Sequence, residues 1–353
     1  MVLGLAITNK GTEDAVAAEL SLLGANNISH LEGAVQFSVK DLTALCSITY
    51  QLRSATKTIQ VLLSDESIMQ KISTLDLSFL AGRTFAVESH VENLEEAEIA
   101  AAINVPESKV NLANPDVKLY ACEFLGKQYF GVDLCGFDLG KRDYRIFLGP
   151  SNIKGTLACS LLKIAGWNPE KTLLDPFCQS GTIVIEAALQ SLQKPVGFHL
   201  KKSFAFIKLI TENVFEAVDE KVLPEKPLGI YAFDPHFKHI SATQKNAKIA
   251  QVNKCLQYSR QDIDWLDIKL EQYGIDCIVT CLPAEKDMKK GDLPAIFLRA
   301  KKILKNNGTI TILAKTKQQE ILDAAKDYKV KEHRTVWQGK SALSVMVFML
   351  KEK

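Results

Sequence analysis

The sequence lacks the features that would place the protein in a membrane, outside the cell or around a metal ion. No stretch approaches the roughly 18 uninterrupted apolar residues of a membrane span. The first residues have neither the basic segment nor the cleavage-like site of a secretory signal. The 8 cysteines include no CxxC pair, which argues against zinc. We therefore expect a cytoplasmic protein with buried, reduced thiols, no membrane contact and no metal.

The glycine patterns of two common nucleotide sites are also missing. Residues 172–175 form a short apolar run that ends in an acid, and the turn PFCQSG follows it with Gly181 as its only glycine. This turn matches neither the G-x-G-x-x-G of dinucleotide sites nor the G-K-[ST] of P-loops. The absence argues against an NAD-dependent dehydrogenase and a P-loop ATPase. The turn alone is also compatible with an ordinary connection between a strand and a helix that binds no ligand.

The composition indicates a soluble globular protein with two or three domains, since the chain has 353 residues, 47% of them hydrophobic and 24% charged. Its charge is uneven. Residues 1–150 carry 12 Lys and Arg against 19 Asp and Glu, whereas residues 151–353 carry 31 against 22. The basic second part suits a polyanionic partner, although the same imbalance could serve solubility alone.

Hydrophobic periodicity divides the chain into three parts. Residues 1–61 alternate strand, helix, strand, helix and strand, which predicts a ferredoxin-like domain. Residues 62–148 predict a second small α+β domain that ends in the basic segment GKRDYR. Residues 149–353 alternate short apolar strands with helices, which predicts an α/β domain whose parallel sheet is covered on both faces.

Polar residues follow several of the predicted strands in the third part. Asp175, Asp234 and Asp262 come at or after three strand ends, and Cys281 closes a fourth. Ligands of open α/β sheets bind outside the carboxyl ends of the strands. A carboxylate at Asp234 can accept both hydroxyl hydrogen bonds of a ribose, and Asp262 can accept from an adenine amino group. The pattern predicts a nucleoside-binding cleft.

The segment DPFCQSGTIVIEAA, residues 175–188, resembles the DPFCGSGTIVIEAA signature of RNA methyltransferases that carry a THUMP domain and modify tRNA guanosine at N2. The resemblance spans the whole chain, because VNLANPDV and the ending LGKRDYR precede the signature in the same order as in that family. It implies a Rossmann-like S-adenosylmethionine-dependent domain at 149–353, preceded by the ferredoxin-like domain at 1–61 and a THUMP domain at 62–148. The cofactor-binding residues that it implies are Lys154, Thr156, Asp175, Pro176, Phe177, Cys178, Gln179, Ser180, Gly181, Thr182, Asp234 and Asp262.

The resemblance also implies that the THUMP domain grips the acceptor end of tRNA or another structured RNA. Two groups of basic residues are candidate RNA contacts. The first group lies in the predicted THUMP domain and comprises Lys109, Lys141, Arg142 and Arg145. The second group lies in the loop after Cys281 and comprises Lys286, Lys289 and Lys290. For each of them, a solvated surface charge remains the alternative. A small activating protein partner is also left open.

Two positions depart from the family signature. Gln179 replaces the middle glycine of the turn, where glycine allows a positive φ and close backbone approach. Residues Cys281, Leu282, Pro283 and Ala284 replace the catalytic motif Asn/Asp-Pro-Pro-Tyr/Phe. This motif accepts from the target amino group and stacks the flipped base, which a cysteine and an alanine do poorly. A nucleophilic thiol at Cys281 is an alternative, but no base lies nearby in the sequence.

We therefore predict a methyltransferase that uses S-adenosylmethionine to modify a base of RNA, most simply tRNA, with guanine N2 favoured. The alternative is a degenerate relative that keeps the fold and RNA binding but has lost methyl transfer. The three acids favour cofactor binding, and the two altered motifs favour the alternative.

Overall fold

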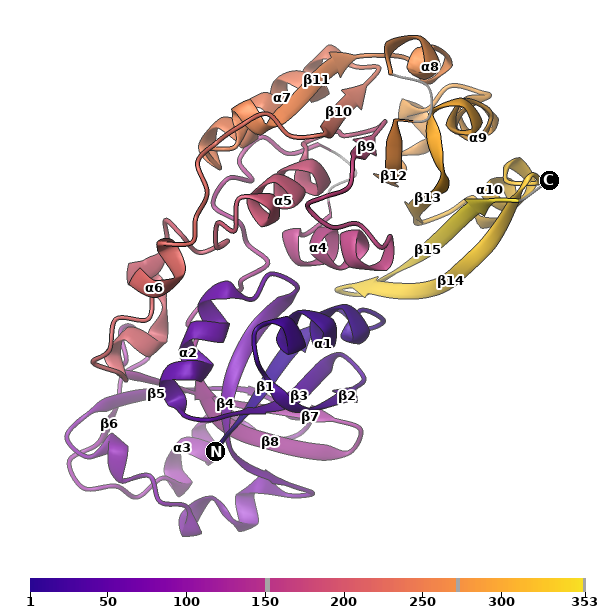
Figure 1. Ribbon diagram of the computed structural model, residues 1–353. Helices are drawn as coiled ribbons and strands as arrows, with labels where there is room; N and C mark the ends of the chain where they lie inside the picture. The colour runs from indigo at the N-terminus through magenta and orange to yellow at the C-terminus, as the bar shows by residue number, and fades with distance from the viewer. Residues whose placement is uncertain (150–152, 271–273, 352–353) are drawn as a thin grey trace. The chain divides into compact units, whose positions relative to one another are not determined.

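In a computed structural model, which describes residues 1–149, 153–270 and 274–351, the chain forms two compact units (Figure 1). The N-terminal unit comprises Met1–Leu139 and Val196–Glu220, and the C-terminal unit comprises Gly140–Pro195 and Lys221–Lys353. Because residues 196–220 belong to the first unit, the third predicted domain is not one continuous segment. Each unit has its own sheet and its own hydrophobic cores.

The N-terminal unit is built on one eight-stranded sheet with the order β2-β3-β1-β4-β8-β7-β5-β6. Its pairs are antiparallel, except that β5 runs parallel to β6 and β7. The strands are β1 (Val2–Thr8), β2 (Asn26–Leu31), β3 (Ala34–Val39), β4 (Ala55–Asp65), β5 (Thr84–His90), β6 (Lys109–Val110), β7 (Val117–Phe124) and β8 (Lys127–Asp133). The predicted boundary after residue 61 falls inside β4, whose pairing with β8 joins the two halves into one sheet. That boundary therefore does not separate two compact units.

Helices and the segment 196–220 cover one face of this sheet. The helices of the unit are α1 (Glu13–Leu22), α2 (Leu42–Gln51), α3 (Glu96–Ala102) and α6 (Glu216–Asp219). Helix α2 begins after Asp41, whose carboxylate accepts the Ala44 N–H at 2.7 Å as an N-cap. Buried Phe204 packs edge-on against Tyr50 of α2, and the Tyr50 hydroxyl donates to Asp219 at 2.8 Å. These contacts explain why the segment belongs to this unit.

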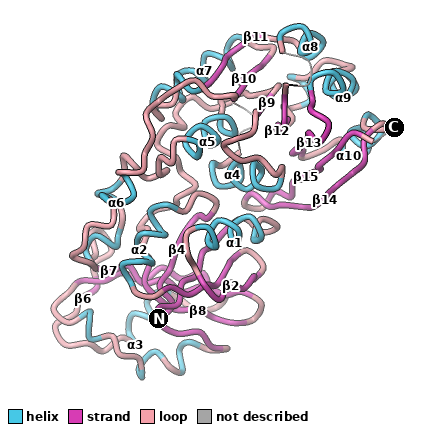
Figure 2. Tube along the Cα trace, in the orientation of Figure 1, coloured by secondary structure: helices cyan, strands magenta, loops and turns pink. Residues whose placement is uncertain are grey.

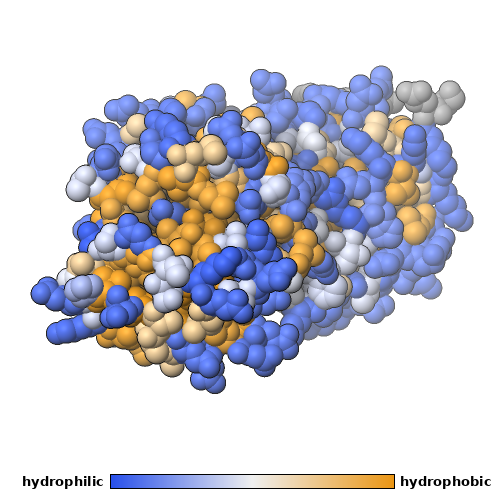
Figure 3. Space-filling model, turned by 90° about the horizontal axis from the view of Figure 1, so that it is seen from below, coloured by the Kyte–Doolittle hydropathy of each residue, from blue (hydrophilic) through white to orange (hydrophobic). Residues whose placement is uncertain are grey.

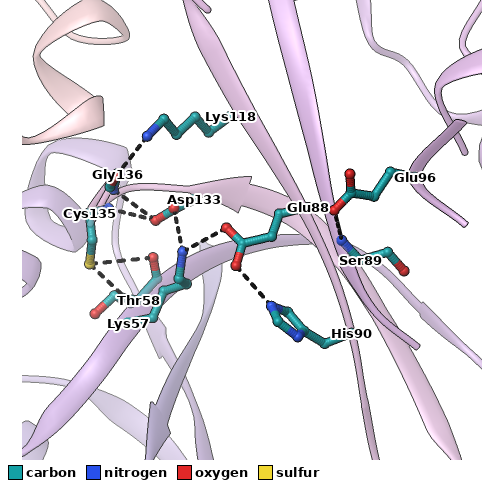
Figure 4. Close-up of polar contacts among 10 residues, drawn as sticks. All are labelled: Lys57, Thr58, Glu88, Ser89, His90, Glu96, Lys118, Asp133, Cys135 and Gly136. Atoms are coloured by element: carbon teal, nitrogen blue, oxygen red, sulfur yellow. Dashed lines mark hydrogen bonds and ion pairs between the residues drawn. The ribbon is translucent and has the colours of Figure 1, made fainter. Parts of the chain in front are cut away.

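The other face of the sheet carries a smaller apolar cluster that is formed by strands alone. Apolar side chains also gather on part of the molecular surface that Figure 3 shows. Beside the cluster formed by strands, a polar network links β4, β8 and β5 (Figure 4). In this network Lys57 of β4 lies 2.7 Å from Asp133 of β8 and 3.3 Å from Glu88 of β5. Burial opposes the charge of Lys57, but its acidic neighbours, Asp133 first and Glu88 next, together outweigh burial and raise the pKa of this lysine.

The C-terminal unit has a seven-stranded sheet with the order β11-β10-β9-β12-β13-β15-β14. Its strands are β9 (Leu173–Asp175), β10 (Ile230–Asp234), β11 (Leu256–Arg260), β12 (Ile275–Cys281), β13 (Leu304–Ala314), β14 (Tyr328–Gln338) and β15 (Ser341–Leu350). The first five in this order run parallel, and β15 is antiparallel to both of its neighbours. The order reverses between β9 and β12. In such sheets this switch point opens the crevice in which ligands bind.

Helices cover both faces of this sheet, as the alternation of strands and helices predicts (Figures 1 and 2). One core contains residues of α4 (Gly155–Ile164), α5 (Thr182–Ser191) and α7 (Phe237–Ile249). The other contains residues of α8 (Leu266–Lys269), α9 (Asp292–Ile303) and α10 (Gln318–Ala324). Among the described residues of the whole chain, no helix combines the length and apolarity that crossing a bilayer requires.

Candidate functional site

The turn between β9 and α5 lies at the switch point and is held by its neighbours. The backbone N–H of Gln179 donates to the carboxylate of Asp234 at 3.1 Å. Helix α7 supplies two side chains: the Thr243 hydroxyl donates to the Gln179 carbonyl at 3.0 Å, and the Asn246 amide donates to the Ser180 carbonyl at 2.9 Å. Gly181 has φ +82°, and a Cβ there would lie 2.5 Å from Thr243, so the turn requires glycine at this residue.

Asp175 ends β9 and is buried. Its Oδ1 accepts the Thr280 hydroxyl of β12 at 2.7 Å and the Phe177 N–H at 3.2 Å. Burial raises the pKa of Asp175 to about 7, although these two hydrogen bonds favour the ionised form. A carboxyl group that titrates near neutral pH at a strand end is a candidate for ligand binding.

Asp234 ends β10 and is also buried, with 1% of its surface exposed. Besides the Gln179 N–H, it accepts the His236 N–H at 2.9 Å, and its Oδ1 lies 2.9 Å from Nδ1 of His239. The two predicted acids Asp175 and Asp234 are therefore brought to neighbouring strand ends. Each carboxylate is oriented by donors from the chain itself.

Four supporting side chains were not predicted from the sequence: His239, Thr243 and Asn246 of α7, and Thr280 of β12. The first three recur at i, i+4 and i+7, so they share one face of α7. This polar stripe on the helix after Asp234 is the sequence feature from which they could have been predicted. Thr280 is a single polar residue in an apolar strand, and nothing in the sequence links it to Asp175.

The other predicted cofactor residues lie in different surroundings. Asp262 has 45% of its side chain exposed and pairs with Lys289 at 2.7 Å. Such an exposed pair opens at little cost. Lys154 precedes α4, and its backbone N–H donates to Gln338 at 2.7 Å, whereas Thr156 is fully buried in α4. The roles of these three residues stay predictions.

Gln179 itself adopts a left-handed backbone conformation, with φ +50°. Its side-chain amide donates to the backbone carbonyl of Cys281 at 2.9 Å. The side chain therefore links the turn after β9 to the carboxyl end of β12. Only 5% of the residue is exposed.

The altered motif at residues 281–284 follows β12. Burial raises the pKa of the Cys281 thiol to about 12, so this thiol is protonated at neutral pH. That argues against Cys281 as a nucleophile. Leu282 is buried, and its N–H donates to Leu313 of β13 at 2.9 Å, so the start of the motif is fixed to the sheet.

A cavity of about 430 Å³ adjoins this motif within the C-terminal unit. Residues 281–285 form one wall, and residues 315–317 after β13 form another. Gln338 and Ser341, at the turn between β14 and β15, also line it. The cavity lining combines cationic, acidic, hydroxyl and amide groups with apolar residues, as small-molecule sites do.

The structure contradicts one predicted RNA contact. The Arg142 side chain is 1% exposed, and its Nε donates to Glu186 of α5 at 2.6 Å. The Tyr144 hydroxyl donates to the same carboxylate at 2.8 Å. A Cβ on Gly155 would meet both charged groups within 2.6 Å, so glycine lets α4 approach the pair. The prediction that Arg142 binds phosphate is wrong, because a buried carboxylate holds its charge.

The remaining RNA candidates are accessible to different degrees. Arg145 is partly buried, and its Nε has no hydrogen-bond partner among the described residues. Five lysines are exposed, as an RNA contact requires: Lys109, Lys141, Lys286, Lys289 and Lys290. Their contact with RNA stays a prediction.

A family model, described as the RMKL-like methyltransferase domain, matches residues 142–344, more than half of the chain. The chain belongs to this family. The match begins close to Gly140, the first residue of the C-terminal unit. The protein therefore has an S-adenosyl-L-methionine-dependent methyltransferase domain.

Two curated relatives of this RMKL-like chain are RNA methyltransferases by name. It is 28% identical to the tRNA (guanine(6)-N2)-methyltransferase of Archaeoglobus fulgidus, over 96% of this chain and 90% of that protein. It is also 28% identical to the ribosomal RNA large subunit methyltransferase K/L of Buchnera aphidicola, over 85% of this chain. The match spans only 48% of the Buchnera protein.

Solved structures confirm the predicted fold. A possible methylase from Clostridium difficile 630 superposes with a TM-score of 0.83 at 19% identity, covering 100% of this chain and 99% of that one. TrmN from Thermus thermophilus gives 0.74 at 21% identity, covering 99% and 100%. At these identities the likeness concerns the fold alone.

The residues of this RMKL-like site fit S-adenosyl-L-methionine at the two carboxylates, which end the neighbouring strands β9 and β10 beside the switch point. When bound, the cofactor supplies an activated methyl group on a sulfonium. Asp175 and Asp234 would hold it, and the backbone of residues 176–181 would lie against it. Gln179 is the exception, since its side chain crosses from this turn to β12.

Proposed function

We propose that this protein transfers a methyl group from S-adenosyl-L-methionine to a base of RNA, that the RNA is a tRNA, and that guanine N2 is the favoured acceptor. The observation that carries the proposal is the arrangement at the carboxyl end of one sheet. Asp175 ends β9 at the switch point, Asp234 ends the neighbouring strand β10, and the cavity beside residues 281–285 adjoins β12 on the other side of β9. This arrangement supports a nucleoside site next to a pocket for the acceptor base.

Cationic residues around the cavity support a nucleic-acid substrate. Lys315 lines it, whereas the neighbouring Lys317 pairs with Glu285 and Glu320 at 3.1 and 3.6 Å. The exposed Lys286, Lys289 and Lys290 lie in the loop that follows residues 281–284. Phosphate contacts of this kind position a polynucleotide without reading its sequence. The name of the Archaeoglobus relative, which this chain matches over 96% of its own length, supports tRNA and guanine N2.

An acceptor amino group has to be oriented so that its nitrogen lone pair faces the methyl group. The family motif that does this is replaced here by Cys281, Leu282, Pro283 and Ala284. The residues that line the cavity carry other acceptors, among them the carboxylate of Glu285 and the hydroxyls of Thr316 and Ser341. Catalysis would depend mainly on positioning.

The N-terminal unit would bind the RNA as a THUMP-containing module. The order of VNLANPDV and LGKRDYR in the sequence supports this assignment. Lys109 is exposed on β6, at the edge of the eight-stranded sheet, and is the candidate contact of this unit. Because acids outnumber bases in residues 1–150, any RNA contact there has to be a local patch.

A binding protein that has lost methyl transfer is the second candidate. Two observations favour it: the Gln179 side chain crosses the switch point, and residues 281–284 lack both the side-chain acceptor and the aromatic ring of the family motif. In this case RNA binding would persist without chemistry.

Incubation of unmodified bulk tRNA with radiolabelled S-adenosylmethionine separates the two candidates. The proposed enzyme incorporates label, and Asp234→Asn, which keeps the size of the side chain, should lower incorporation at least tenfold. Asp264→Asn is the matched control, because Asp264 is 71% exposed in the same unit. If no label is incorporated while tRNA is retained on a filter, the binding protein is correct and the enzyme is excluded.

A further inference from the structure

Gln179 occupies the position at which the family signature has glycine. At φ +50° the residue adopts the left-handed conformation that glycine enters freely and that most side chains avoid. The turn is held in this shape by hydrogen bonds on both sides of the residue, to Asp234 through its N–H and to Thr243 through its carbonyl. The backbone conformation is therefore imposed by the site, and the large side chain is an addition to it.

The side chain has a defined partner. Its Nε2 donates to the Cys281 carbonyl at 2.9 Å, and the residue is 95% buried. Strands β9 and β12 are direct neighbours, paired at Leu173 with Cys277 and at Leu174 with Ile278. The hydrogen bond therefore spans the carboxyl ends of the two strands between which the sheet order reverses. Ligands of parallel sheets bind at this place.

We infer that the hydrogen bond from the Gln179 side chain to the Cys281 carbonyl lowers the affinity of the site for its methyl donor, and we call this contact the latch. A donor that enters the crevice between β9 and β12 displaces the amide from the Cys281 carbonyl. The bond is partly buried, so the amide and the carbonyl each lose a partner unless the ligand or water replaces it. This inference rests on the proposed function, because it assumes that the crevice is the cofactor site.

The size of the effect follows from one partly buried hydrogen bond. Breaking such a bond changes a binding constant by about tenfold. Gln179→Gly removes the latch, so it should tighten binding by about tenfold. Gln179→Asn tolerates the same backbone but is one carbon too short for the bond, so it should also tighten binding, by several-fold.

Calorimetric titration with S-adenosylhomocysteine tests the inference on the full chain. The matched control is Gln193→Gly, because Gln193 also has a positive φ, +54°, in the same unit but is exposed. Its substitution relieves similar backbone strain without touching the crevice, so binding should equal that of the wild type. Circular dichroism and thermal melting of each variant establish that it is folded.

The outcomes separate this inference from the proposed function. Tighter binding by both Gln179 variants and not by Gln193→Gly supports the latch. Unchanged or weaker binding by folded Gln179→Gly overturns it, as does a gain in Gln179→Gly that Gln179→Asn does not share. The wild type's own methyl incorporation into tRNA tests the function independently, because micromolar wild-type binding with incorporation upholds the enzyme even where the latch fails.

Discussion

The burial of Asp175 leads to a prediction about stability that does not depend on any ligand. The carboxyl group is 2% exposed, and burial raises its pKa from 3.8 to about 7. We expect Asp175→Asn to stabilise the C-terminal unit at pH 8. Asparagine keeps an oxygen that can accept from Thr280 and Phe177, as the carboxylate does.

The sign follows from proton binding. Between pH 4 and 7 the folded protein retains a proton on Asp175 that the unfolded chain releases. Stability therefore falls as the pH rises through this window, and it stays low above it. A difference of about 3 pKa units corresponds to roughly 4 kcal/mol at pH 8. Asparagine does not titrate, so the variant should match the wild type near pH 4 and exceed it by roughly this amount at pH 8.

Tryptophan fluorescence during urea unfolding measures the effect in the right unit, because all 3 tryptophans, Trp167, Trp265 and Trp337, belong to the C-terminal unit. Groups that do not interact with Asp175 titrate equally in both proteins, so the pH dependence of the difference between variant and wild type comes from Asp175 and its interaction with Asp234. A difference that is constant from pH 4.5 to 8, or that favours the wild type more at high pH, would refute the reasoning.

Two further predictions concern the buried ion pair and the altered motif. Arg142→Met removes the guanidinium that balances buried Glu186, so it should destabilise the C-terminal unit by about 3–5 kcal/mol in the same fluorescence assay. Its tRNA retention per folded molecule should equal that of the wild type, and a selective loss of retention would restore Arg142 as an RNA contact. The triple change Cys281→Asn, Leu282→Pro and Ala284→Tyr should raise methyl incorporation, and adding Gln179→Gly should raise it further. Unchanged turnover in the triple variant, followed by a gain on adding Gln179→Gly, would assign the defect to Gln179 alone.

The sequence was sufficient for the parts of the fold that depend on local pattern. Short apolar segments that end in Asp175 and Asp234 are buried parallel strands, and the acids meet because the carboxyl ends of parallel strands share an edge. Contacts between distant segments could not be predicted from local pattern. Residues 196–220 join the N-terminal unit through Phe204 and Tyr50, and neither local sequence indicates that these two residues are in contact.

Arg142 shows how a local reading can fail although the signal exists. In the segment GKRDYR the residue looks like one of several surface cations. Its partner Glu186 is 44 residues away and stands in the apolar helical run TIVIEAAL, where an acid has to be compensated if it is buried. The acid within an apolar helix was the informative residue, and it predicts a buried cation from elsewhere in the chain.

Gln179 and Cys281 look like independent departures from the family signature, because 102 residues separate them. In the structure they are one contact, since the amide of Gln179 donates to the carbonyl of Cys281. Isolated substitutions in a buried site tend to leave a polar group without a partner, which costs stability. Here the new side chain reaches the backbone of the other altered position. Because the acceptor is a backbone carbonyl, Cys281→Asn keeps this bond and only a change at Gln179 removes it. The gain expected from the triple change and the further gain on adding Gln179→Gly therefore test different groups, the side chains of the motif in the first case and the amide that crosses to β12 in the second.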